Sequence, residues 1–466
     1  MTEKLTVHGL DDDESRILND NWARLDARRR RNLSRADLYD GKQFMGFVKS
    51  GVVPPQYYQL GIALGWAGKA IDSLVRRCRI EAMVWPDGDL ASIGGPEIVR
   101  DNALLSELRQ GLTDSALHGP AYIITTQGMP GEPRSLVHVK DATTATGTLN
   151  PRTRRLDDAL SVTDWDEHGK PSGLVLYLPD LTVSAERVAG RWQVERSEHS
   201  WGVPVEPLIY RPRPSKRYGQ PRLTRPMIGL QMQAIRELVR LEGHMDIYSY
   251  PELWLLGGDL SVFKNADGSQ QSMWQVMLGR IKGLADDTDT NKPDGLQRAE
   301  VKQFPAASPE PHLATLDMLS RAFAREASLP DSAVALTGTA NPTSADAYDA
   351  AQYELIAEAE GAMADWEAPI TRATARALAI LNQSAVDPRW LTIAPQWLGA
   401  KFESKAAKAD AGAKAIGAIP WLAETRVGLE MLGLSEQQID LAMAEKRRAS
   451  GRAVIEALGA RNGVSG

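Results

Sequence analysis

The fold is decided by the stretch from Ser344 to Asn382, SADAYDAAQYELIAEAEGAMADWEAPITRATARALAILN. Its apolar and small side chains recur every three or four residues, which predicts one long helix with an apolar face packed in a core. Pro342 blocks extension towards the amino terminus, and Thr343 or Ser344 can cap the first turn. Pro369 is expected to kink the helix, because its ring clashes with the preceding turn.

Working outward, two further helices are predicted before this one. The first runs from Met227 to Tyr248, with apolar residues on one face and charged residues on the others. Thr224 is a suitable N-cap, and Pro226 falls in the first turn, where its missing N–H costs nothing. The second helix is expected to begin after Pro309.

The segment between these two helices combines strand and helix signals. Leu253–Leu256 is typical of a strand, Asn265–Gly268 of a turn, and Trp274–Leu284 is mixed. Two helices that flank a small inserted module indicate a stalk with a head at its end.

Residues 120–200 change to the period of strands. Tyr122–Thr125, Leu136–Val139 and Leu174–Leu178 are rich in β-branched or aromatic residues and are separated by turns. They predict a compact antiparallel β region in a mainly helical α+β chain. His138 has no second histidine or carboxylate at ligand spacing, which favours a hydrogen-bonded strand residue over a metal ligand.

Helices are also predicted near the amino terminus. Residues 12–50 form a charged segment that contains Arg28–Arg31, a run interpreted either as a solvated helix face or as a phosphate contact. Ile62–Ile80 has the spacing of a helix. Cys78 falls on its apolar face, so we expect packing and no reactivity.

The carboxyl-terminal part is predicted to be helical as well. Residues 401–466 are rich in Ala, Lys and Glu, and they are broken at Pro420 and Gly433. Before the long helix, a loop of small residues runs from Leu329 to Asn341.

A proline-rich connection at 204–220 is expected to be neither helix nor central strand, because proline fixes φ and lacks an N–H. The most concentrated positive patch of the chain lies in this connection and directly after it: Arg211, Arg213, Lys216, Arg217 and Arg222. Two interpretations remain open, a solvated loop or a contact with nucleic acid or an acidic neighbour.

Composition and the absence of known motifs argue against several classes of protein. The net charge of −6 argues against a nucleic-acid coating protein, and a single cysteine allows no internal disulfide. We expect no membrane span or signal peptide. No phosphate loop, HExxH or GxSxG motif occurs, and the acidic stretch from Asp286 has Lys292 and Arg298 where a calcium loop needs glycine and glutamate. No enzyme activity, cofactor or metal is expected.

Three ordered sets of residues carry a resemblance to a known family. They are Pro204–Pro207 with Arg211–Arg213, Arg217–Gly219 and Tyr250–Leu256; Asn341–Ala345 opening the long helix; and Ala409–Ala411 with Ile419-Pro420 and Glu430–Leu434. In this order they resemble the portal proteins of tailed bacteriophages, of the siphophage type that infects actinobacteria, similar to the SPP-like portal group. The matching segments cover about half of the chain.

The resemblance implies a portal fold with wing, stem, clip and crown. The wing would comprise 1–220 and 344–400, the stem helices 221–250 and 309–328, the clip 251–308, the tunnel loop 329–343 and the crown 401–466. It implies a ring, usually a dodecamer, at one capsid vertex of the virion, assembled in host cytoplasm.

The same resemblance implies partners and site residues. The partners are double-stranded DNA bound non-specifically, the terminase large subunit, head-completion or adaptor proteins, and the major capsid protein or scaffold. The tunnel loop would line the channel with Asp331, Ser332, Thr337, Thr339 and Asn341. Arg211, Arg213, Lys216 and Arg217 would contact phosphate or a neighbouring subunit. The clip would bind partners through Trp254, Phe263 and Trp274.

One departure concerns the tunnel loop, which contains no Lys or Arg, so steric guidance of DNA fits it better than a phosphate grip. Three alternatives remain open at this point. They are another ring-forming head–tail connector or structural virion protein, an enzyme acting on nucleic acid, and a helical scaffold of the host cell.

Overall fold

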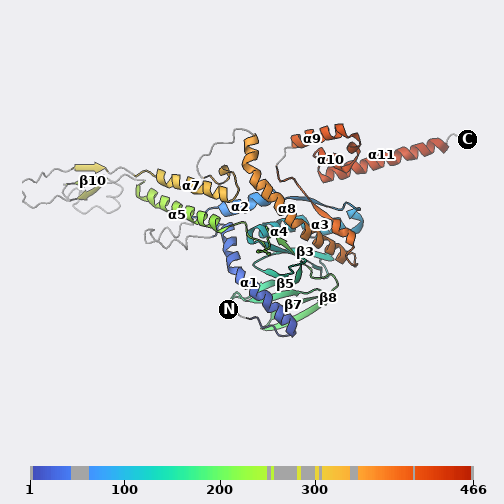
Figure 1. The fold of residues 1–466 in the computed structure, drawn as a ribbon, viewed down its shortest axis with the longest axis horizontal. Helices are drawn as coiled ribbons and strands as arrows, with labels where there is room; N and C mark the ends of the chain where they lie inside the picture. Colours follow the sequence, from blue (N-terminus) through green and yellow to red (C-terminus); the bar gives the residue numbers. More distant parts are fainter. Residues whose placement is uncertain are drawn as a thin grey trace, which may run out of the picture. The chain divides into compact units, whose positions relative to one another are not determined.

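The computed structural model describes residues 4–42, 62–248, 253–256, 281–284, 300–303, 307–335, 345–401 and 405–462. The chain divides into two compact units, Met1–Leu398 and Gly399–Gly466 (Figure 1). It is a mixture of helices and mainly antiparallel sheets, as predicted. Among the described residues, no helix combines the length and the apolar character that a membrane crossing requires.

The first unit contains the following elements. The helices are α1 Asp12–Tyr39, α2 Trp66–Val75, α3 Gly95–Asp101, α4 Leu104–His118, α5 Arg225–Tyr248, α7 Glu310–Glu326 and α8 Ala345–Leu381, with short 3-10 turns η2 Leu90–Ile93, η4 Asp331–Ala333 and η5 Pro388–Thr392. The strands are β1 Ile80–Val84, β2 Pro120–Gln127, β3 Ser135–Asp141, β4 Ala145–Leu149, β5 Leu156–Trp165, β6 Pro171–Tyr177, β7 Leu181–Val188, β8 Arg191–Glu198, β9 Val205–Ile209, β10 Leu253–Leu256, β11 Ile281–Leu284, β12 Glu300–Gln303 and β13 Ala394–Trp397.

The long helix α8 agrees with its prediction to within one residue at each end. Its apolar face is buried, and the Trp366 indole Nε1 donates a 3.0 Å hydrogen bond to the Ser115 hydroxyl on α4. The helix continues through Pro369, and the kink there stays a prediction.

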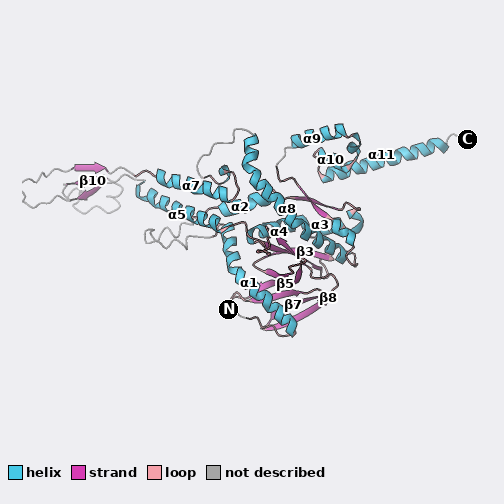
Figure 2. Ribbon diagram, in the orientation of Figure 1, coloured by secondary structure: helices cyan, strands magenta, loops and turns pink. Residues whose placement is uncertain are grey.

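The predicted antiparallel β region is confirmed as two sheets. One has the order β3-β2-β9, and the other is a five-stranded meander, β4-β5-β6-β7-β8. In Figure 2 these strands gather between α1 and the layer that contains α4 and α8. Helix α1 covers the five-stranded sheet, where its Leu18, Trp22 and Leu25 share a core with Leu160 and Val162.

The prediction for 204–220, neither helix nor central strand, is confirmed at its start, where the segment supplies an edge strand that the sequence did not indicate. Val205–Ile209 forms β9, which pairs with β2 and places Pro207 opposite Tyr122. Because β9 is the edge of its sheet, the missing N–H of Pro207 costs no ladder bond on the open side.

The predicted helix Ile62–Ile80 is also shorter than expected. It ends at Val75, and Ile80 begins β1, whose partner is Trp397 on β13. Cys78 lies between these elements and is buried, as predicted for a packing residue.

The predicted pair of helices is confirmed as α5 and α7, which lie side by side (Figure 1). Thr224 caps α5, because its Oγ1 accepts from the Met227 N–H at 3.5 Å. Across the pair, the His312 imidazole meets the Glu237 carboxylate at 2.7 Å. Beyond the pair, β10 is the central strand of a three-stranded sheet, parallel to β11 and antiparallel to β12.

The second unit is helical, with α9 Lys405–Ala418, η6 Pro420–Glu424, α10 Arg426–Met431 and α11 Glu436–Asn462. Both predicted breaks are confirmed. Pro420 opens η6, and Gly433 separates α10 from α11 with a positive φ of 83° that glycine adopts without strain.

Candidate functional site

A buried ion pair lies where the stalk helices join the body of the first unit. Arg222 immediately precedes α5 and is 2% exposed, so it is not the surface cation that the sequence indicated. Its guanidinium donates to the Glu358 carboxylate of α8 at 2.7 Å and to the Ala327 carbonyl after α7 at 2.8 Å. It also donates to the Ala70 carbonyl of α2. One side chain therefore holds four segments together.

Two further groups lie near this pair. The Tyr210 hydroxyl donates to Glu358, and burial raises the pKa of Tyr210 far above its usual value. Burial raises the pKa of the Cys78 thiol to about 12, so this thiol stays protonated and unreactive at neutral pH. The centre is a structural joint without a reactive nucleophile.

A second buried ionic cluster fastens α8 to the edge strand β9. Glu206, 2% exposed, accepts from Arg372 at 2.8 Å and from Arg376 at 2.7 Å. The ion pairs of Glu206 and of Glu358 therefore link α8 to the segment 205–222 at two points. Local sequence gave no signal for either pairing, because the partners lie more than 130 residues apart.

The predicted basic residues of the connection after β9 do come together. Arg211, Arg213, Lys216 and Arg217 are all exposed, and the backbones of Arg213 and Lys216 pair with each other. The turn is fixed at Tyr218, whose hydroxyl donates to the Gly147 carbonyl of β4 at 2.9 Å.

Part of this turn forms one wall of a cleft of about 460 Å³. Arg213 and Arg217 enter from the turn, Arg154 from the β4–β5 turn and Arg372 from α8. Asp365 is the acidic residue among the lining side chains. Burial raises its pKa, although the Arg211 backbone N–H donates to it. We call this cavity the arginine cleft.

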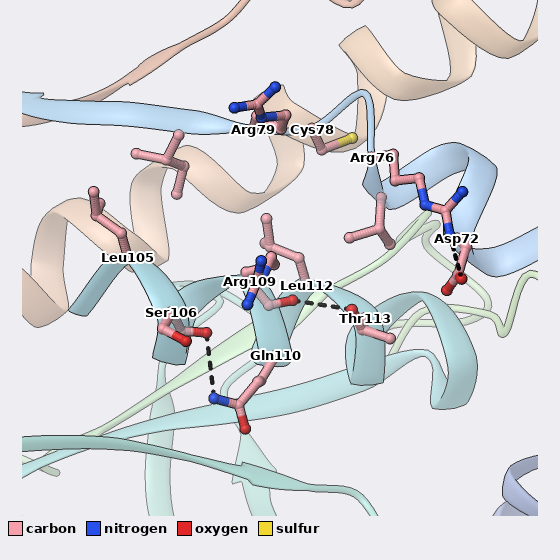
Figure 3. Close-up of a pocket in the computed structure, with 12 residues that line it drawn as sticks. Asp72, Arg76, Cys78, Arg79, Leu105, Ser106, Arg109, Gln110, Leu112 and Thr113 are labelled. Atoms are coloured by element: carbon pink, nitrogen blue, oxygen red, sulfur yellow. Dashed lines mark hydrogen bonds and ion pairs between the residues drawn. The ribbon is translucent and has the colours of Figure 1, made fainter. Parts of the chain in front are cut away.

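A larger cleft of about 770 Å³ lies between α4 and the segment that links α2 to β1 (Figure 3). Arg76 pairs with Asp72 at its rim, while Arg109 and Gln110 extend from α4. Its apolar lining residues include Val75, Ile80, Leu105 and Leu112. The lining thus combines apolar and basic side chains.

Arg28–Arg31 does not behave as one solvated face. The Arg28 guanidinium lies 4.6 Å from the centre of the Tyr218 ring, and that of Arg29 lies 3.8 Å from the Trp165 ring. Arg30 and Arg31 are exposed. The first two arginines therefore stack on aromatic rings, an arrangement that the sequence did not reveal.

The expected channel residues are described only in part. Asp331 and Ser332 lie in η4 and are exposed, whereas Thr337, Thr339 and Asn341 lie outside the described residues. The base of the loop is anchored by Leu329 and Val334, which are 6% and 4% exposed. Of the expected clip residues, Trp254 lies on β10, where the structure describes the backbone alone. Phe263 and Trp274 lie outside the described residues.

The histidines show no metal chemistry in the described part of the chain, where no group of three His, Cys, Asp or Glu could hold an ion. His138 is on β3, and its buried Nδ1 has no hydrogen-bond partner. Burial lowers the pKa of His138 and of His118 to about 4. Both rings are therefore neutral at neutral pH.

The chain belongs to the phage portal proteins, in the family described as SPP1 Gp6-like, whose model matches residues 18–452. The resemblance in the sequence is thereby confirmed, and the chain is a structural component of the virion at the capsid, not an enzyme.

Individual relatives agree with this family. The portal protein of Mycobacterium phage D29 is 26% identical over 373 residues, which cover 78% of this chain and 75% of the relative. The portal protein of Mycobacterium phage L5 is also 26% identical, with 78% and 74% covered.

Among solved structures, the neck of an empty gene transfer agent particle computed with C6 symmetry is similar at 14% identity and a TM-score of 0.41, covering 82% of this chain and 94% of that chain. The neck of the native particle computed with C12 symmetry gives 15% and 0.38, with the same coverage.

Proposed function

We propose that this portal protein assembles into a ring of about twelve copies at one capsid vertex, and that genomic DNA passes through the ring during packaging and ejection. The observation that carries the proposal is the family match over residues 18–452. The proposed partners are double-stranded DNA, the terminase large subunit, head-completion or adaptor proteins, and the major capsid protein or scaffold. Assembly would take place in the host cytoplasm.

The elements suggest how the parts divide the work. The side-by-side helices α5 and α7 would be the stem, and the sheet of β10, β11 and β12 would belong to a clip that receives terminase and later the adaptor. The β sheets, α1–α4 and α8 would form the wing. The separate unit Gly399–Gly466 would form the crown.

Charge supports a passive channel. A subunit with a net charge of −6 repels DNA at long range, which keeps adhesion weak. The loop 329–343 contains Asp331 as its one charged residue and no Lys or Arg, so its contact with DNA would be steric. Scattered exposed arginines would add brief, salt-sensitive phosphate contacts that carry no base information.

The test is electron microscopy of the purified full-length protein together with its mass in solution. We expect rings with a central hole, broad wings and a protruding stem. A protein that remains monomeric across a wide concentration range would contradict the proposal.

A further inference from the structure

The arginine cleft offers a strong set of hydrogen-bond donors. Four guanidinium groups line it against one carboxylate. Arg372 is already paired with Glu206, whereas Arg154, Arg213 and Arg217 are exposed. Five prolines also line the cleft, so its walls are rigid: Pro151, Pro207, Pro212, Pro214 and Pro369. A preformed site loses little conformational entropy when a ligand binds.

A backbone acceptor in the wall of the cleft also lacks its usual donor. Pro369 has no N–H, so the carbonyl of Asp365, four residues earlier in α8, lacks its intrahelical bond. Both residues line the cleft. A matching ligand therefore carries an anionic group for the arginines and an N–H for this carbonyl. A carboxylate-bearing peptide provides both, whereas a phosphate backbone provides acceptors alone.

The chain itself contains such a peptide. Asp11–Glu14 is the longest run of acidic residues in the sequence, and it opens α1. Asp11 and Glu14 are occupied with each other in the capping box, and Glu14 also pairs with Arg196. Asp12 and Asp13 are exposed in the first turn, where backbone N–H groups have no intrahelical acceptor, and Asp13 also pairs at the surface with Arg16 at 3.2 Å. This turn presents two carboxylates beside free N–H donors.

The two surfaces lie on opposite edges of one sheet. Arg196, which holds the start of α1, is on the edge strand β8, while Leu149 and the turn after it belong to the other edge strand, β4. Along α1, Asp12 is about 24 Å from Arg28, which stacks on Tyr218 next to the cleft. A rigid helix thus keeps the acidic turn away from the cleft of its own chain. Complementary patches on opposite edges are what a head-to-tail ring requires.

We propose that the acidic first turn of α1, through Asp12 and Asp13, docks into the arginine cleft of the adjacent copy in the ring. The inference rests on the proposed ring. It assigns Arg154, Arg213 and Arg217 to a neighbouring subunit rather than to DNA, and it gives Pro369 a role as the residue that frees an acceptor.

A charge-exchange experiment with the full-length protein tests this contact. Arg213→Glu/Arg217→Glu and Asp12→Lys/Asp13→Lys should each raise the concentration needed for half-assembly about tenfold or more, measured by mass photometry. Each variant alone has a like-charge junction at every contact. In a mixture, the two variants can alternate around the ring so that opposite charges meet at every junction, and one chain with all four changes restores opposite charges in the same way, so both should regain rings. Arg30→Glu/Arg31→Glu, exposed on α1 outside the cleft, is the matched control and should assemble normally.

A second measurement uses a cysteine pair. Asp12→Cys with Arg217→Cys should give disulfide-linked multimers under mild oxidation, and neither single variant should, since Cys78 is buried. Wild-type monomers would remove the proposed function and this contact together. If wild-type rings form and charge reversal does not weaken them, or the combined variant is not rescued, the contact alone is wrong. If Arg213→Glu/Arg217→Glu assembles fully but no longer binds duplex DNA, the proposed subunit contact is wrong and these arginines bind DNA phosphates instead.

Discussion

At the scale of single residues, the buried pair of Arg222 and Glu358 is the most consequential contact of the body. We expect Glu358→Ala to lower the free energy of unfolding by about 3–5 kcal/mol, because it leaves Arg222 charged and uncompensated at 2% exposure. Chemical denaturation measures the change. Glu354→Ala, on the exposed side of the same helix, should change stability by less than about 0.5 kcal/mol. Equal effects of the two substitutions would contradict the assignment.

A buried carboxyl makes stability depend on pH. Burial, and then the charge of Asp141, raise the pKa of Asp114 from 3.8 to about 7. The folded state therefore holds a proton that the unfolded state releases, and stability falls as pH rises from about 4 to 7. Asp114→Asn should melt at a higher temperature than wild type above pH 7 and at the same temperature near pH 4. The His118 contribution, of opposite sign, is common to both proteins and cancels in the comparison.

Residue-scale roles were the hardest to predict from sequence. Arg222 counts as one more surface cation in a basic stretch, because its partners Glu358, Ala70 and Ala327 become neighbours only after folding. Arg213 and Arg217 are exposed in one turn, and their role as phosphate or subunit contacts stays a prediction. The cleft around them depends on Arg154 and Arg372 from distant elements, which no local pattern reveals.

At the scale of elements, Gly428 fixes how α10 meets η6. A Cβ there would overlap the Leu422 carbonyl oxygen, a backbone atom that cannot move alone. We expect Gly428→Ala to reduce hydrogen-exchange protection across residues 405–462. Gly451→Ala, in α11 with open space around it, should instead increase helix stability by about 1 kcal/mol. Unchanged protection in the first variant would show that the close approach is not needed.

The loop between α7 and α8 provides a second prediction at this scale. Deleting residues 337–340 leaves the anchors Leu329 and Val334 in place, so rings should still form. The number of DNA-filled heads that retain their genome should fall, because the loop is proposed to contact DNA. Counting filled heads by electron microscopy measures this. A normal yield of filled, stable heads would contradict the proposal that the loop contacts DNA in the channel.

Elements were predictable where their signals are local. The apolar repeat and Pro342 define α8 almost to the residue, and Pro420 and Gly433 mark the breaks of the second unit. Two strands that the sequence did not indicate are β1 and β9, since each is a strand because of a partner far along the chain. Strand identity at Ile80 depends on Trp397, which a window around Ile80 cannot contain.

At the scale of the whole molecule, a subunit with a net charge of −6 predicts weak DNA binding. Purified rings should bind duplexes of unrelated sequence with equal affinity, and the affinity should fall steeply as salt rises. Fluorescence anisotropy at several salt concentrations measures both properties. Tight binding that persists at high salt, or a preference for one sequence, would contradict a passive channel.

The position of Arg222 has a mechanical consequence for the assembled particle. It stands at the root of α5 and also grips the carbonyl that follows α7, so both helices of the pair are clamped at one point. A load applied at the sheet of β10, β11 and β12, when another protein binds or leaves, would be transmitted along the helices α5 and α7 to Arg222. Arg222 lies beside the base of the loop 329–343 and beside α8. If the sheet of β10, β11 and β12 lies outside the capsid and the loop 329–343 lines the DNA channel, as proposed, a load on that sheet would reach the channel through one guanidinium group.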